Sequence, residues 1–286
     1  MTETRPMFWS VRRELWENRS IFIAPLAVAA VMPFGFLISA IGMPQRRRAV
    51  LLLDPVHQRA LIGQPYDIAA IILIVTAFIV AVFYCLDALH GERRDRSILF
   101  WKSLPVSDRT TVLAKAAIPL VVLPAIIFAI IVVTQFIMLL LSTLVLLRSG
   151  LAATTWTRFN LIQQSLILLY GLIALSLWHA PIYGWMLMVS SWARRATFLW
   201  AVLPFFAIAM FERIALGSSR FGLMLRSRVM GFAAEAFAFN KYGSIDSLTQ
   251  LTPGRFLSTP GLWIGLILAA IFLAAATRLR RNREPI

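Results

Sequence analysis

Side chains that could do acid–base chemistry gather in one charge-dense stretch, residues 87–115, which lies between two long apolar runs. Within it, four ionisable residues stand close enough in sequence to converge near lipid headgroups: Asp87, His90, Glu92 and Asp95. The sequence has no HExxH or GxSxG motif and no close carboxylate pair suited to acid–base work. We therefore assign no catalytic residue, although a membrane-embedded enzyme acting on lipids would have to use this set.

Phosphate and metal chemistry have no motif in this sequence. The pattern GxxxxGK[ST], whose backbone amides cradle phosphates, does not occur, so we expect that the chain does not hydrolyse ATP and holds no cofactor itself. The histidines, His57, His90 and His179, are far apart, and Cys85 is the single cysteine. We predict neither a metal site nor an intrachain disulfide.

Five polar residues interrupt the apolar runs and would lie at membrane depth: Thr134, Gln135, Gln163, Gln164 and His179. Polar groups are costly in hydrocarbon and usually face the interior of a bundle or a water-filled cavity. These residues are therefore candidates for a path along which a substrate moves. Hydrogen bonding between helices is the alternative role, and the sequence leaves both open.

The composition is that of a polytopic membrane protein. Hydrophobic residues make up 59% of the chain, charged residues only 14%, and the mean hydropathy is +0.78, which excludes an ordinary soluble domain. The net charge of +15 comes from Lys and Arg scattered between the apolar runs rather than gathered on one domain. Anionic lipid headgroups explain this pattern better than a nucleic acid does, so we expect membrane lipids and no nucleic acid as partners.

Hydrophobic run lengths predict an all-α fold with six transmembrane helices, because each run can cross a hydrocarbon core of about 30 Å. The predicted spans are Ile21–Gly42, Ile68–Leu89, Ala116–Leu147, Leu161–Trp192, Ala196–Leu216 and Phe256–Thr277. The third run is too long for one upright crossing, so it must tilt, bend at Pro119 and Pro124, or project from the bilayer. No cleavable signal peptide is evident at the start.

Residues 1–20 are expected to form an interfacial elbow before the first span. Met7–Arg19 reads as an amphipathic helix with one apolar stripe, Met7, Phe8, Val11 and Leu15. The opposite face carries Ser10, Arg13, Glu14 and Glu17. An ordinary solvated helix packed on a neighbour is the alternative.

The distribution of Lys and Arg favours cytoplasmic termini, because more of them fall on the segments that a cytoplasmic start would place inside. The loop with Arg46, Arg47 and Arg48 runs against this rule. Residues 217–259 form a long mixed region that could lie outside the membrane.

The stretch around Trp101 is predicted to be a short interfacial helix with two partners. Charged residues Glu92–Arg96 precede four consecutive bulky apolar residues, Ile98–Trp101. At about 100° per residue these four side chains sweep most of a helix circumference, so they cannot all face one neighbour. Pro105 ends the helix. We expect it to lie between the membrane bundle and something outside it.

This stretch also resembles a known family. An apolar span ending in Gly91–Arg93, then Ser97, Leu99, the run Ser103–Ser107, and Lys115 opening the next span are similar to the permease subunits of ABC-2 type transporters. The resemblance implies a single transmembrane domain over residues 1–286. It implies that residues 91–106 are a cytoplasmic coupling helix docking into a separate ATP-binding subunit. The coupling residues would be Glu92, Arg93, Arg94, Asp95, Arg96, Ser97, Ile98, Leu99, Phe100, Trp101, Lys102, Leu104 and Pro105.

Further expectations come from this resemblance alone. It implies export, a bacterial inner membrane, ATP and Mg²⁺ in the partner subunit, and a dimer with a second permease copy or a paralogue. It also implies a re-entrant hairpin within residues 217–259, where composition would equally allow a surface helix. A lipid-modifying membrane enzyme and a non-transporting scaffold or sensor are the alternative classes.

Overall fold

The computed structural model describes residues 6–97, 106–241 and 243–282. Within these ranges the regular structure is helical, apart from one isolated antiparallel bridge between Phe237 and Leu251. Six helical segments are long and apolar enough to cross a membrane. The predicted all-α class with six membrane-spanning helices is therefore confirmed by length and composition.

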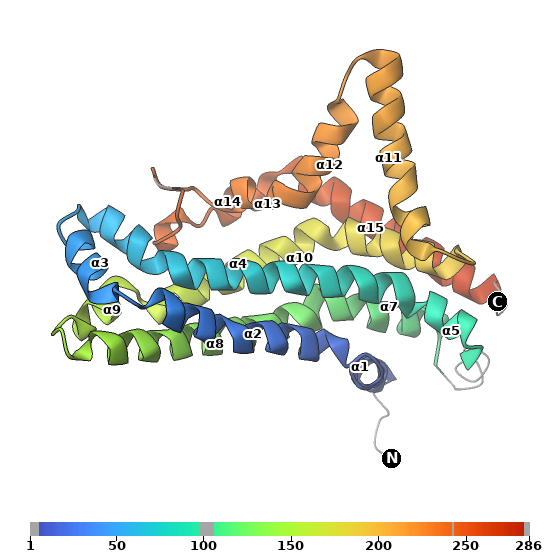
Figure 1. Ribbon diagram of the computed structural model, residues 1–286. Coiled ribbons are helices and arrows are strands. Elements are labelled where there is room, and N and C mark those ends of the chain that lie inside the picture. Colours follow the sequence, from blue (N-terminus) through green and yellow to red (C-terminus); the bar gives the residue numbers. More distant parts are fainter. Residues whose placement is uncertain (1–5, 98–105, 242, 283–286) are drawn as a thin grey trace.

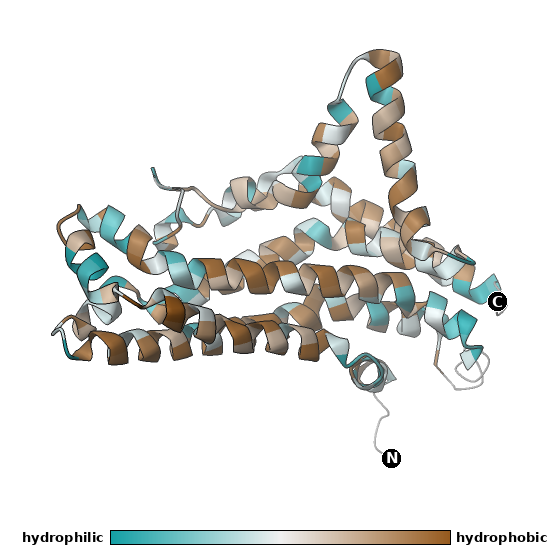
Figure 2. Cartoon of the chain, viewed as in Figure 1, coloured by the Kyte–Doolittle hydropathy of each residue, from teal (hydrophilic) through white to brown (hydrophobic). Residues whose placement is uncertain are grey.

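Five long helices run side by side and form a bundle (Figure 1). They are α2 (Ser20–Ser39), α4 (Pro55–Ala88), α8 (Leu123–Leu147), α10 (Leu161–Trp192) and α15 (Pro260–Asn282). Their middle sections are apolar, and hydrophilic residues collect toward both ends of the bundle (Figure 2). Leu73, Ile131 and Leu187 are fully buried at its centre. In a lipid environment the helices are held together mainly by close packing of such side chains, because burying apolar surface from lipid contributes little.

Predicted and observed spans differ mainly at their ends. α10 has the predicted limits, and α2 and α15 are shifted by a few residues. α4 instead begins at Pro55, well before the predicted Ile68. Asp54 caps it by accepting a hydrogen bond from the His57 N–H at 3.2 Å, and Pro55 stands at the first helical position, where its missing N–H costs nothing.

The long third run is not one regular helix. It consists of α7 (Asp108–Ala117), a π-helical turn over Ile118–Val122, and α8. Pro119 lies in that turn and Pro124 near the start of α8, which are the two prolines at which a bend was predicted. Proline removes a backbone donor and displaces the preceding carbonyl, so a change of helical pitch follows there.

Helix α11 (Thr197–Leu216) stands away from the bundle and forms a hairpin with α12 (Arg220–Met230) (Figure 1). Glu212 fixes the turn, because its carboxylate accepts hydrogen bonds from the Ser218 hydroxyl and from the Arg220 and Phe221 N–H groups at 2.5–2.8 Å. These bonds satisfy donors that the start of α12 leaves free. Gly217 takes the positive φ of 61° that the end of α11 requires.

The region after α11 contains a second short helix, α13 (Phe232–Ala236), directly after α12. The two helices are separated at Gly231, where a Cβ atom would overlap the Ser227 carbonyl. A 3₁₀ turn (Leu248–Gln250) and α14 (Pro253–Ser258) then lead into α15. α12 and α13 pack against α10, and α13 also contacts α14.

Short helices close the two ends of the bundle. α3 (Met43–Val50) and α9 (Ala152–Arg158) lie at one end, which we call the far end (Figure 1). α1 (Pro6–Glu17), α5 (His90–Arg94) and the first turns of α7 lie at the other, together with the last turns of α15. We call this second end the charged end, because buried ion pairs join these helices there.

The backbones of α10 and α15 approach each other closely at Gly184. A Cβ atom added at Gly184 would lie 3.2 Å from the Ala269 carbonyl oxygen and 3.3 Å from its Cα, both of which are backbone atoms. Only glycine lets the two backbones come this close without a shift.

Replacing Gly184 by Ala should therefore push α10 and α15 apart and lower the unfolding free energy by about 1–3 kcal/mol, as overpacking does elsewhere. Thermal unfolding in detergent can be followed with a thiol-reactive dye, because Cys85 is fully buried until the chain unfolds. Gly35→Ala is the matched control, since nothing lies within 4 Å of its added Cβ. Equal unfolding temperatures for the two variants would contradict this account of the packing.

Candidate functional site

A cluster of buried charges lies at the charged end of the bundle. Its members, which we call the charged cluster, are Arg13, Glu14, Glu92, Asp108, Lys115 and Arg280. They come from α1, α5, α7 and α15, so residues far apart in sequence meet in one place. Three carboxylates face three cations, and the cluster is formally neutral.

Lys115 is the centre of the charged cluster. Its ammonium nitrogen lies 2.9 and 3.0 Å from the two Glu14 carboxylate oxygens and 3.1 Å from Glu92 Oε1. The exposed fractions of the Lys115 and Glu14 side chains are 2% and 1%. Charges this deeply buried are tolerated only when they are paired and hydrogen-bonded, which both are.

Glu92 extends the charged cluster toward the end of α15. Its second oxygen accepts a hydrogen bond from Arg280 Nη1, and Arg280 Nε lies 3.1 Å from Asp108 Oδ1. Arg13 Nη2 lies 2.7 Å from Glu14 Oε1 and 3.3 Å from Glu92 Oε1. Every helix that contributes a cluster residue is thus tied to at least one other by an ion pair.

The Glu14 carboxylate is held in its charged form. Burial alone would raise its pKa, but the attraction of Lys115 and the hydrogen bonds from Lys115 and Arg13 outweigh burial, so the pKa lies below its ordinary value of 4.5. The Tyr84 hydroxyl donates a further hydrogen bond to Glu14 Oε2 at 2.8 Å. α4 is joined to the cluster through this bond.

The helix α5 is also fastened to the end of α10. Arg93 is buried, and its Nη1 donates to the Ser191 carbonyl at 2.8 Å. The Ser190 hydroxyl accepts hydrogen bonds from the Leu89 and His90 N–H groups at 3.1 and 2.9 Å. These bonds satisfy backbone donors at the α4–α5 junction and fix α5 against a second face of the bundle.

The predicted coupling residues divide into a buried and an exposed part. Glu92 and Arg93 are buried, whereas Arg94, Asp95 and Arg96 are exposed. Ser97 is half-buried, with its hydroxyl 3.4 Å from the Glu92 carbonyl. The remaining members lie outside the described residues: Ile98, Leu99, Phe100, Trp101, Lys102, Leu104 and Pro105.

The four residues considered for lipid chemistry point in different directions. Asp87 and Asp95 are exposed and both pair with Arg94, at 3.7 and 3.0 Å. Glu92 is buried in the charged cluster, and His90 Nδ1 lies 3.1 Å from the Ala193 carbonyl. The side chains of the set therefore do not face one common point.

The five candidate path residues lie in different surroundings. Thr134 donates to the Ile130 carbonyl of its own helix at 2.7 Å. His179 has one ring nitrogen 2.9 Å from the Leu175 carbonyl and the other 3.1 Å from the Val229 carbonyl in α12. Gln163 donates to the Asp246 carbonyl at 2.5 Å. Thr134 is therefore bonded within its own helix, whereas His179 and Gln163 each join α10 to another segment.

Gln135 and Gln164 instead share a groove of about 590 Å³ between α4, α10 and the segment after α13. Gln164 Nε2 lies 3.4 Å from Asp67 Oδ1, and Gln135 Nε2 lies 3.3 Å from the Tyr66 carbonyl. Asp67 was not among the predicted site residues, because the predicted second span begins one residue after it, at Ile68.

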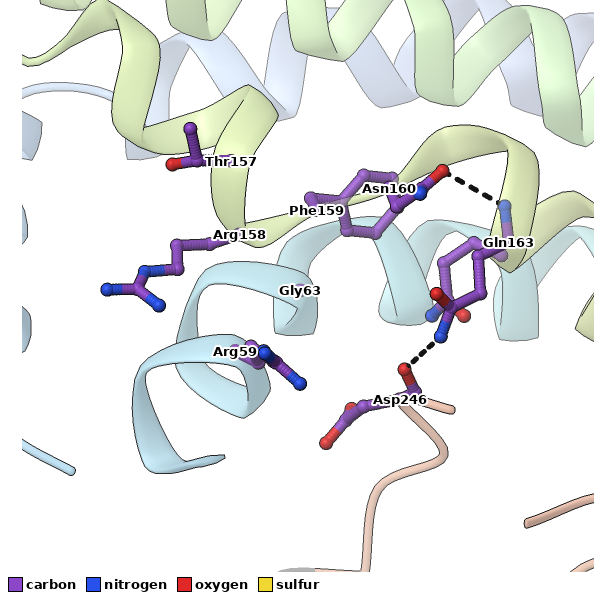
Figure 3. A pocket seen from close by; sticks show the side chains of 9 residues that line it. Arg59, Gly63, Thr157, Arg158, Phe159, Asn160, Gln163 and Asp246 are labelled. Carbon is purple, nitrogen blue, oxygen red and sulfur yellow. Dashed lines mark hydrogen bonds between the residues drawn. The ribbon is translucent and has the colours of Figure 1, made fainter. Parts of the chain in front are cut away.

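A smaller polar pocket of about 200 Å³ lies beside this groove (Figure 3). Arg59 of α4 and Arg158 of α9 line it together with Asp246, and Gln163 closes one side through its bond to the Asp246 carbonyl. Gln164 borders both the pocket and the groove.

Part of the polar face of α1 is turned toward the bundle. Ser10 and Glu14 are its buried residues, whereas Phe8, Trp9 and Trp16 are more than half exposed. Local periodicity could not indicate the burial of Glu14, because its partner Lys115 lies 101 residues further along the chain. Val11 and Leu15 still pack against the core.

No protein family, no curated protein and no solved structure matches this chain.

Removing one charge from the centre of the charged cluster should destabilise the protein. Glu14→Gln leaves Lys115 with Glu92 alone, and we expect a loss of about 2–3 kcal/mol in unfolding free energy, somewhat less than the about 3–5 kcal/mol typical of a buried pair stripped of its only partner. Glu17→Gln on the same helix is the control, because its side chain is 45% exposed and the expected loss is below about 0.5 kcal/mol. The Cys85 labelling assay measures both, and equal losses would contradict the cluster's role.

The lowered pKa of Glu14 predicts a specific pH dependence. A carboxylate whose folded-state pKa is depressed adds stability above its unfolded value and loses it as the pH falls through the folded value. The difference in unfolding temperature between the wild type and Glu14→Gln should therefore be constant above pH 4.5 and shrink below it. A difference that grows with acidity would contradict this assignment.

Proposed function

We propose that this chain is the membrane-embedded permease subunit of an ATP-driven transporter, with residues 91–106 receiving force from a separate ATP-binding subunit. The supporting observation is that Glu92 and Arg93 are both buried. Glu92 forms ion pairs with residues of α1, α7 and α15, and Arg93 donates a hydrogen bond to α10. A connection that merely joined two spans would not need two buried ionic side chains at its base. The resemblance to ABC-2 permeases supplies the partner and the direction, export.

The contacts suggest how such a force would spread. Movement of α5 would act on α10 through Arg93 and Ser190, and on α7 and α15 through Glu92. Since these pairs are buried and mutually satisfied, breaking one is costly and the helices would move together. Closure of the ATP-binding subunits would then shift the bundle between inward-open and outward-open states.

The rest of the proposal follows from the resemblance. The chain lies in a bacterial inner membrane with both termini in the cytoplasm, and it pairs with a second copy or a paralogue. ATP and Mg²⁺ belong to the partner subunit. The exposed apolar face of α11, including Phe206, Phe211 and Ile214, leaves room for such a second permease chain or for lipid.

Association with the ATPase tests this function. A tagged chain co-expressed with a P-loop ATPase encoded by a neighbouring reading frame should retain it through purification. Leu99→Glu and Trp101→Glu should weaken the association at least about tenfold, because bulky apolar residues at the centre of an interface carry most of its binding energy.

Leu52→Glu is the matched control, since Leu52 is 88% exposed and lies near α3 at the far end of the bundle. It should leave the association unchanged. A well-folded chain that binds no ATPase would contradict the transporter proposal, as would labelling of residue 99 or 101 only from the extracytoplasmic side. Lipid turnover by the purified chain, abolished in Glu92→Gln with Asp95→Asn, would favour the enzyme instead.

A further inference from the structure

The groove between α4 and α10 is lined by one acidic side chain, Asp67, which has no ion-pair partner among the described residues. Asp67 is half-buried, and the Gln164 amide at 3.4 Å is the one polar contact of its carboxylate that the structure gives. Within the described part of the chain, no Lys or Arg lies within ion-pair distance of it. His57, which also borders the groove, is 4.0 Å from Asp54 instead.

A second acceptor in the same groove is also unsatisfied. Gln135 has an exposed fraction of 4%, and its Oε1 has no hydrogen-bond partner among the described residues. A buried polar atom normally has a partner, and Gln135 borders the groove, so a donor in the groove could satisfy this oxygen once the amide turns toward it. Asp67 and Gln135 come from different helices, α4 and α8, yet both line this groove.

The rest of the groove is mainly apolar. Ile68, Ile71, Ile167, Leu168 and Ile245 are among the apolar residues that line it. The volume of about 590 Å³ falls within the range of about 300–1,000 Å³ that is typical of sites for drug-sized ligands. An occupant should therefore be apolar along its body and carry a positively charged group that donates hydrogen bonds.

We propose that this groove binds an amphipathic amine, with its ammonium group at Asp67 and Gln135 and its apolar body along Ile71 and Ile167. An ammonium has three donors and no acceptor, which complements a carboxylate and an unpaired amide oxygen. Arg59, Arg158 and Asp246 line the neighbouring pocket, whereas no Lys or Arg is among the described residues that line the groove. The proposal concerns binding alone and does not depend on ATP-driven transport.

Photolabelling of the full-length chain in nanodiscs tests the site. The probe is dodecylamine carrying a diazirine, and its N-acetylated form is the matched uncharged probe of similar length. Labelled peptides are identified by mass spectrometry. The amine should label residues 60–71, 164–168, 239–241 and 243–245 at least about tenfold more than the acetylated probe does, because the latter leaves Asp67 without a counter-ion.

Asp67→Asn should abolish that preference, and Gln135→Leu should reduce it. Glu235→Gln is the control variant, since that carboxylate pairs with Arg255 outside the groove and should leave labelling unchanged. The proposal is overturned if both probes label the groove equally in the wild type, or if Asp67→Asn keeps the preference. Equal labelling of all lipid-facing helices would show membrane partition only and would overturn it as well. The first comparison uses the wild type, so a poorly folding variant does not affect it.

Discussion

The ion pair between Glu14 and Lys115 constrains this fold more than any other single contact. Both side chains are almost completely buried, so neither charge can regain water unless α1 leaves the bundle or α7 moves with it. The pair is joined through Glu92 to Arg280, which makes the elbow helix, the second connection and the last span one ionic unit. In lipid, contact between apolar helix surfaces contributes little free energy. The buried ion pairs therefore specify which helices are neighbours.

The charged cluster also explains why the charge-dense stretch of the sequence is not simply a solvated surface. Its inner residues, Glu92 and Arg93, bind the bundle, and its outer residues, Arg94 and Asp95, pair with each other or with Asp87 at the surface. One turn of helix thus has Glu92 and Arg93 directed into the bundle and Arg94 exposed at the surface. The bonds of the buried pair hold the exposed residues in place.

The sequence allowed the fold class and most spans to be predicted, because run length and apolar composition are local properties. α10 was predicted to the residue, since Asn160 caps it and Ala193 follows it in extended conformation. The start of α4 was missed because His57, Gln58 and Arg59 look like a loop, although Asp54 followed by Pro55 is a helix-start signal. The charged cluster could not be predicted, since Glu14, Glu92, Lys115 and Arg280 meet only through tertiary packing.

Two helices connect the charged cluster with the groove at the other end. α4 carries Asp67 in one half and leads into α5 at its end, while α10 carries Gln164 near its start and Ser190 near its end. At 1.5 Å per residue, Asp67 and Glu92 are separated by about 38 Å along a nearly continuous helix. Because α5 at the end of this helix is bonded to Ser190 and Ser191 of α10, the relative placement of α4 and α10 is fixed at the charged end. The spacing between Asp67 and Gln164 in the groove therefore depends in part on bonds made at the opposite end of the same two helices.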